Sequence, residues 1–183
     1  KTSLFELICR LYDPINGEIL IDGKSLKSFK LSEIRKNIGY VPQNPFLFSE
    51  SIKDNIKFGK NNSTPKEIKS AAHKASIHEE IKKLKYGYET VLGERGITLS
   101  GGQVQRISIA RAFIKNPPII LLDDCLSAVD TNTEETILKN LYNYSKNKTT
   151  LIISHRISSI KSANNIMVFK NGNLIEHGDH KKL

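Results

Sequence analysis

A run of four apolar residues, Ile119 to Leu122, most constrains the fold, because it lies between two prolines and two aspartates. Pro117 and Pro118 end any helix that precedes it. The run is short and shows no polar alternation, so it predicts a strand that is buried on both faces, as in a parallel sheet covered by helices. No apolar run in the chain is longer than four residues, whereas a helix that spans a membrane needs roughly 20 such residues.

Helix and strand patterns alternate around this strand, which predicts an α/β fold with a mostly parallel sheet. A lysine-rich helical stretch over 51–84 interrupts the alternation and predicts an inserted helical subdomain. A hairpin is expected across Asn171 and Gly172. The other expected strands cover 18–23, 38–41 and 149–153, and the other expected helices cover 4–11, 31–36, 101–116, 131–145 and 157–161.

The charge balance is basic, with 28 Lys and Arg against 19 Asp and Glu and a formal net charge of +9. Such a balance raises the question of nucleic-acid binding. The cations are mostly lysines scattered along the chain, so we interpret them as solvated faces and expect no nucleic-acid partner. Cys9 and Cys125 are too few for a disulfide scaffold or a four-ligand zinc site. His177 and His180 have the spacing of a metal pair, but no third ligand is near them in the sequence.

Two carboxylates, Asp123 and Asp124, follow the buried strand directly. Ligands of open α/β sheets bind at the carboxyl ends of the strands. A hard cation such as Mg²⁺ prefers oxygen ligands and keeps its waters, so one carboxylate can hold the cation and its neighbour can address a water. The plainer alternative is a strand end followed by solvated acids.

The segment Leu99-Ser100-Gly101-Gly102-Gln103 directly precedes an expected helix. Ser100 and Gln103 have the spacing of a capping box, so a plain helix cap is one interpretation. The same geometry offers free N–H groups, a hydroxyl and the positive end of the helix dipole, without a Cβ in the way. The segment is therefore also suited to bind a phosphate group.

Four further positions are informative mainly through their order in the chain. Lys1-Thr2 at the start of a helix matches the end of a phosphate-binding P-loop. Gln43 and His155 each follow an expected strand, although a solvated glutamine and a structural histidine are the plainer interpretations. Asp130 can be the N-cap of the helix from Thr131.

Taken together in this order, these motifs resemble the nucleotide-binding domain of ATP-binding-cassette (ABC) transporters. The resemblance covers essentially the whole chain. The matches are Lys1-Thr2 with the end of the Walker A motif, Gln43 with the Q-loop, 99–103 with the signature motif, Asp123 with the Walker B aspartate, 127–130 with the D-loop, and His155 with the switch histidine.

The resemblance implies a P-loop NTPase fold of the RecA type, as a single ABC ATPase domain over 1–183. The core would comprise 1–43 and 113–183, with a remnant of an antiparallel β subdomain. The helical subdomain would comprise 44–112 and carry the signature motif.

The resemblance also implies ATP and Mg²⁺ as cofactors. Lys1, Thr2 and Ser3 would contact the phosphates, and Thr2, Gln43 and Asp123 would hold Mg²⁺. Asp124, His155 and Gln43 would carry out catalysis. The signature segment (99–103) would reach the ATP held by a second nucleotide-binding domain, in a homo- or heterodimer, and Asp130 would also lie near the nucleotide.

Two stretches narrow the resemblance to bacterial multidrug or lipid exporters. They are Gly93-Glu94-Arg95-Gly96 and the segment from Asn44 to Ile56. In such exporters a membrane domain is fused upstream of this one, and the ATPase domain lies at the cytoplasmic face of the cell membrane.

This sequence departs from the family pattern in two ways. The P-loop glycines and the strands that normally precede Lys1 are missing, so we expect a fragment of a longer chain that binds ATP poorly by itself. Asp124 stands where the family usually has glutamate. This predicts a slow site, and it leaves open a mainly ATP-binding half of a heterodimer. A soluble cassette ATPase that acts on nucleic acid is a third alternative.

Overall fold

The computed structural model describes residues 1–93 and 99–182. Its helices are α1 (Thr2–Ile8), α2 (Leu31–Asn37), α3 (Ile52–Lys57), α4 (Pro65–Lys74), α5 (His78–Lys83), α6 (Gly101–Lys115), α7 (Thr131–Tyr144) and α8 (Ile157–Ile160), with 3₁₀ turns η1 (Leu26–Ser28) and η2 (Gly87–Glu89). Its strands are β1 (Leu20–Ile21), β2 (Lys24–Ser25), β3 (Ile38–Val41), β4 (Ile119–Asp123), β5 (Thr149–Ile153), β6 (Ile166–Lys170) and β7 (Asn173–Gly178). Among the described helices, none combines the length and the apolar character that a bilayer span requires.

The strand predicted from the apolar run is confirmed as β4, the middle strand of a parallel sheet ordered β3-β4-β5. Tyr40 of β3 pairs with Leu121, and Leu122 pairs with Ile152 of β5. Ile120 and Leu121 are both fully buried although they point to opposite faces of the sheet. Such burial on both sides explains why this strand shows no polar alternation.

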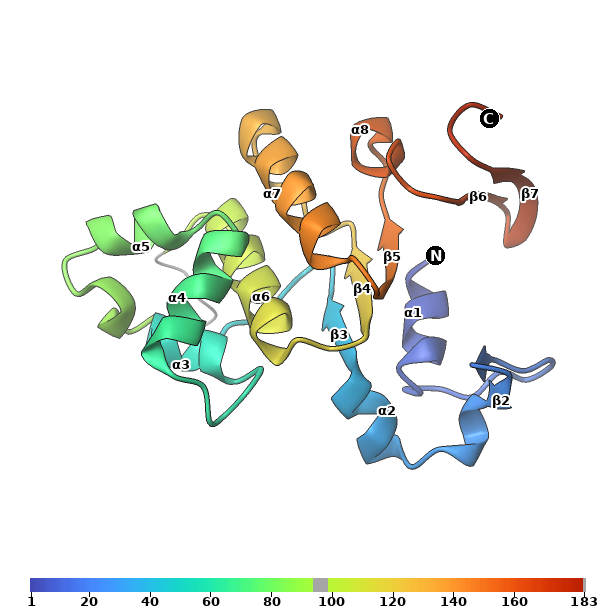
Figure 1. Cartoon of the computed structure of the whole chain (residues 1–183), viewed down its shortest axis with the longest axis horizontal. Helices are drawn as coiled ribbons and strands as arrows, with labels where there is room; N and C mark the ends of the chain where they lie inside the picture. Colours follow the sequence, from blue (N-terminus) through green and yellow to red (C-terminus); the bar gives the residue numbers. More distant parts are fainter. Residues whose placement is uncertain (94–98, 183) are drawn as a thin grey trace.

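Two hydrophobic layers cover the sheet. On one face, Phe5 of α1 and Ile34 of α2 pack with Leu121. On the other face, Ile120 and Leu122 belong to the larger core formed by α3, α4, α6 and α7. Figure 1 shows the helical part, α3 to α6, on one side of β3 and β4, and α1 and α2 on the other.

The predicted hairpin at the carboxyl end of the chain is confirmed as β6 and β7, which pair antiparallel. Asn171 and Gly172 at the turn both have positive φ, 50° and 81°. A turn that requires this conformation at both central residues favours Asn-Gly, because glycine has no Cβ to clash.

Three sequence expectations were wrong in extent. The helix expected over 4–11 is α1, which begins at Thr2 and ends at Ile8, because Arg10 adopts a positive φ of 49°. The strand expected over 18–23 is reduced to β1, because Asp22 and Gly23 both adopt positive φ and turn the chain back into β2. The helical stretch over 51–84 is divided into α3, α4 and α5. Ser51 and Thr64 cap the first two of these helices with their hydroxyls, and Ser76, with φ 54°, turns the chain between α4 and α5.

Candidate functional site

Polar side chains follow each strand of the parallel sheet at its carboxyl end. Gln43 follows β3, Asp123 ends β4 and Asp124 comes next, and His155 follows β5. Because parallel strands bring these ends to one edge of the sheet, their loops form the common binding position of α/β proteins. The structure brings Gln43 and Asp124 together, with 3.5 Å between Gln43 Nε2 and Asp124 Oδ2.

Asp123 is 1% exposed and points into this edge. In the described part of the chain, its side chain has one hydrogen-bond donor, the hydroxyl of Tyr40 on β3, at 3.4 Å from Oδ2. Burial, together with the charge of Asp123, raises the pKa of Tyr40 to about 12, so the hydroxyl stays protonated. A buried carboxylate with one long, neutral hydrogen bond is poorly compensated. The site therefore fits a hard cation such as Mg²⁺.

Asp124 is held by its backbone. Its N–H donates to the carbonyl of Ile153 at 2.8 Å, and its φ of 44° lies in the left-handed region. Aspartate is among the residues that adopt this conformation more readily. The resulting turn keeps the carboxylate of Asp124 beside Gln43.

His155 is exposed, and the next residue ties this strand end to the segment 127–130. The guanidinium of Arg156 donates to the carbonyl of Ser127 at 2.9 Å and to that of Val129 at 3.3 Å. Arg156 also pairs with Glu134 on α7. The backbone around His155 and the segment before Asp130 are therefore parts of one hydrogen-bonded unit.

Glu134 is 2% exposed and anchors that unit. Ser159 and Ser158 donate to its carboxylate at 2.5 Å and 3.3 Å. Burial by itself raises the pKa of Glu134, but the hydrogen bonds from Ser159 and Arg156 outweigh it and lower the pKa below the usual value. The carboxylate stays ionised and keeps Arg156 in place.

The capping box predicted for the signature segment (99–103) is confirmed. Ser100 Oγ accepts from the Gln103 N–H at 3.3 Å, and Gln103 Oε1 accepts from the Ser100 N–H at 2.9 Å. Leu99 is half-buried and packs against the core, and Ser100 and Gly101 are exposed. The N-terminal end of α6 therefore presents a polar, accessible surface.

This end of α6 lies directly against the segment 127–130. A Cβ added to Gly102 would stand 2.8 Å from the carbonyl oxygen of Ala128, so only glycine allows the observed approach. Gln105 accepts from the Ala128 N–H at 3.1 Å and donates to Ser127 Oγ at 3.3 Å. The cap predicted at Asp130 is also confirmed, since its carboxylate accepts from the Thr133 N–H at 3.0 Å.

Two arginines fasten α6 to the rest of the helical part. Arg106 pairs with Glu80 of α5, whose carboxylate also accepts from Gln103 Nε2 at 3.0 Å. Arg111 donates to the carbonyl and the side chain of Asn55 on α3, each at 2.8 Å, and to the carbonyl of Phe46 at 2.9 Å. Burial lowers the pKa of Arg111 to about 10. These contacts connect the segment after Gln43 to α6.

Lys1, Thr2 and Ser3 are exposed at the start of α1. The helix is fixed to the sheet through Phe5, which packs with Leu121 of β4. The segment Gly93 to Gly96, which resembles exporters, lies outside the described residues except for Gly93.

The sequence interpretation missed five residues that hold the motifs in place, namely Gln105, Arg106, Arg111, Glu134 and Arg156. Three of them lie on α6, where long polar side chains interrupt an otherwise apolar pattern. Buried polar residues at such positions need partners, and this was the available signal. For Glu134 and Arg156 the sequence shows no local signal, because their partners are distant in the chain.

Comparison with known protein families decides the relationship. The family model described as "ABC transporter" matches residues 1–127. The chain belongs to the ABC transporter family. The predicted α/β fold of the P-loop NTPase type is confirmed.

The similar proteins carry names of ABC transporters or exporters. A Staphylococcus aureus protein named as a multidrug export ATP-binding/permease protein is 46% identical over all 183 residues, and the ABC transporter ATP-binding protein YfiB of Bacillus subtilis is 50% identical. The solved structure of a bacterial Atm1-family ABC exporter with ATP bound matches the whole chain with a TM-score of 0.97 at 41% identity. In each case the chain spans 32% of the longer protein.

Proposed function

We propose that this chain binds and hydrolyses ATP within a larger ABC exporter and couples ATP-driven closure to transport of a drug, a lipid or a similar substrate. The observation that carries the proposal is the meeting of Gln43 and Asp124 beside the buried, poorly compensated Asp123. This edge of the sheet combines a cation site at Asp123, a carboxylate at Asp124 that can orient a water, and the polar side chain of Gln43. Such a combination suits phosphoryl transfer to water.

In this proposal the chain works as one ATPase domain with two parts. The core comprises 1–43 and 113–183, and the helical subdomain comprises 44–112. Contacts of Gln105, on α6 of the helical subdomain, with Ser127 and Ala128 of the core support the coupling of the two parts.

The proposed roles follow the chemistry of each side chain. Lys1 neutralises the β- and γ-phosphates of ATP, with Thr2 and Ser3 beside it. Thr2, Gln43 and Asp123 hold Mg²⁺, which neutralises phosphate charge when it is bound. Asp124 orients the attacking water and accepts its proton. His155 contacts the γ-phosphate and stabilises the charge that develops there.

The signature segment (99–103) serves the ATP of a second nucleotide-binding domain in this proposal. Ser100, Gly101 and Gly102 lie at the positive end of α6, which suits a phosphate of the opposite site. Ser100 and Gly101 are exposed there, and Gly102 packs against Ala128. Asp130 lies in the segment that Gln105 connects to α6, so closure of the two domains acts on both at once. We expect the pair at the cytoplasmic face of a membrane, with a transmembrane domain in the same polypeptide.

The test uses Asp124→Glu in the full-length protein. The Asp124 side chain is one methylene shorter than glutamate, which draws its carboxylate back by roughly 1 Å, and a displacement of this size can lower the rate about 10²-fold. We expect Asp124→Glu to raise ATP turnover and Asp124→Asn, the matched control, to abolish it. An unchanged rate in both variants would refute the role of Asp124.

The same protein, reconstituted alone in lipid, separates the two candidate functions. Brisk ATP turnover of the unaltered protein indicates a homodimer in which Asp124 suffices. A near-zero rate that a second chain with glutamate at this position restores indicates a heterodimer, in which this chain mainly binds ATP. The aspartate at position 124 is the observation that favours this second candidate.

A further inference from the structure

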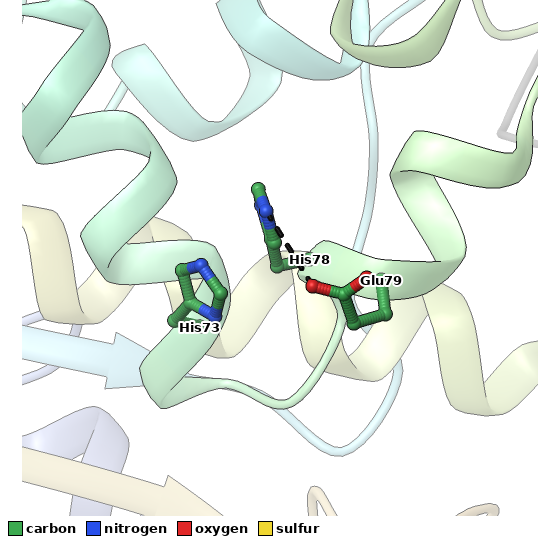
Figure 2. Close-up of side chains that lie close together, drawn as sticks. All are labelled: His73, His78 and Glu79. Atoms are coloured by element: carbon green, nitrogen blue, oxygen red, sulfur yellow. Dashed lines mark ion pairs between the residues drawn. The ribbon is translucent and has the colours of Figure 1, made fainter.

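A second cluster of chemically active side chains lies far from the sheet edge, at the turn between α4 and α5. His73 is in the last turn of α4, and His78 and Glu79 are the first two residues of α5. Their ligand atoms all lie within 4.8 Å of one another. Figure 2 shows His78 between His73 and Glu79, with the dashed line joining the His78 ring to the Glu79 carboxylate.

We propose that His73, His78 and Glu79 form a binding site for a transition-metal ion of the Zn²⁺ type. Two imidazoles and one carboxylate are a common ligand set for zinc. Mg²⁺ and Ca²⁺ prefer all-oxygen ligands, so the histidines disfavour them. The site is unrelated to the nucleotide and does not depend on the proposed function.

The geometry of the cluster is close to that of a bound ion. Zinc–ligand bonds of about 2.0–2.1 Å in a tetrahedral site place neighbouring ligand atoms about 3.4 Å apart. The His78 Nε2 to Glu79 Oε1 distance is 3.7 Å, so this edge of the tetrahedron is nearly formed. The rings of His73 and His78 lie next to each other, with centroids 3.8 Å apart and planes tilted by 32°. His73 is exposed and can complete the site by a rotation of its side chain.

Tyr88 supplies the second interaction that histidine ligands of metals usually need. Its hydroxyl lies 2.7 Å from His78 Nδ1. Burial, with the charge of Glu79 adding to it, raises the pKa of Tyr88 to about 12, so the hydroxyl remains neutral. When this oxygen accepts from Nδ1–H, the lone pair of Nε2 faces Glu79. Metal-binding histidines are oriented in this way by a partner on the other ring nitrogen.

The charges around the cluster permit a cation. Lys82 pairs with Glu79 through the other carboxylate oxygen, Oε2, at 3.3 Å. Oε1 is the atom that faces His78, so both contacts can exist at once. An exposed lysine–glutamate pair contributes only about 0–1 kcal/mol, so it competes weakly with a metal ion.

A bound ion would connect α4 to α5 across Ser76. The same turn holds the signature helix, because Arg106 donates to the Ser76 carbonyl at 2.8 Å and pairs with Glu80, the residue after Glu79. The ion would therefore restrain the turn that anchors α6.

The test measures zinc binding by the full-length protein, stripped of metal and free of nucleotide, in competition with a chromophoric chelator. We expect the unaltered protein to bind one Zn²⁺ more than His73→Ala. Because His73 is exposed, this variant keeps the fold. His177→Ala, which removes another exposed histidine, is the matched control and should bind as the unaltered protein does.

Two further variants separate coordination from mere packing. Glu79→Gln keeps the shape of the side chain, and we expect it to weaken the binding of this ion by more than tenfold. Tyr88→Phe removes only the hydroxyl, and we expect a loss of about 10- to 100-fold. Equal zinc stoichiometry and affinity in the unaltered protein and in His73→Ala would overturn the proposal. So would zinc-induced protection of the 74–84 amides from hydrogen exchange that persists in His73→Ala.

Discussion

The approach of the signature helix to the segment 127–130 depends on the absence of a single carbon atom at Gly102. A Cβ there would lie 2.8 Å from the Ala128 carbonyl oxygen, and real Cβ atoms essentially never come that close. Forcing an extra methyl group into such a contact costs about 1–3 kcal/mol. The better helix propensity of alanine returns at most about 1 kcal/mol. We therefore expect Gly102→Ala to loosen this contact by up to about 2 kcal/mol.

Gly101→Ala is the matched control for this prediction. Its Cβ would lie 3.5 Å from the Ala128 Cβ, an ordinary van der Waals distance. The two variants add the same atom to adjacent residues of the same helix turn. Only Gly102→Ala creates the overlap, so the difference between the variants isolates its effect.

Hydrogen exchange of the nucleotide-free, full-length protein measures the effect locally. A loss of up to about 2 kcal/mol raises the population of the open form by up to roughly 30-fold. We expect this acceleration at the amides of 126–134 and of the first turn of α6 in Gly102→Ala. Gly101→Ala should exchange as slowly as the unaltered protein. If both variants exchange alike, the close approach does not stabilise this contact and the reasoning fails.

Three further outcomes are expected. Asn55→Ala removes a fully buried side chain and leaves the partly buried N–H and carbonyl of Phe48 without their partner, so it should lower the free energy of unfolding by about 2 kcal/mol, and an unchanged denaturation midpoint would contradict this. Arg156→Ala should lower ATP turnover several-fold without changing ATP affinity, and a change confined to affinity would count against its positioning role. Burial raises the pKa of Cys125 to about 12, so a maleimide at pH 8 should leave this thiol unmodified until the protein is unfolded; rapid labelling of the folded protein would show that it is accessible.

Local signals explain why much of the fold could be predicted from the sequence. The strand β4 was located by the two prolines before its four apolar residues and the two aspartates after them. Ser100 and Asp130 marked the starts of α6 and α7 as capping residues. Asn171-Gly172 located the last hairpin. Each of these signals lies within a few residues of the structure it specifies, so no knowledge of the rest of the chain was needed.

Most of the structure that the sequence did not predict depends on contacts between residues distant in the chain. The division of 51–84 into three helices is an exception, because the caps at Ser51 and Thr64 mark it locally, although the lysine-rich pattern obscures them. Packing of α3 and α4 on α6 completes this arrangement. The partners of Arg111 and Arg156 lie 22 to 65 residues away in the chain. At the candidate site, the ordered motifs located Gln43 and Asp124 at one sheet edge, whereas the catalytic and metal-binding roles stay predictions.

The pairing of β3 with β4 also affects the order in which the chain can fold. Ile38 is aligned with Ile119, so about 80 residues separate the paired positions and enclose the whole helical part. At a synthesis rate of about 5–20 residues per second, β3 leaves the ribosome roughly 4–16 s before its partner strand. Helices α3 to α5 can pack locally during this interval, whereas the sheet must wait for a long loop to close. Because β3 has only four residues, it exposes little edge to other nascent chains while it waits.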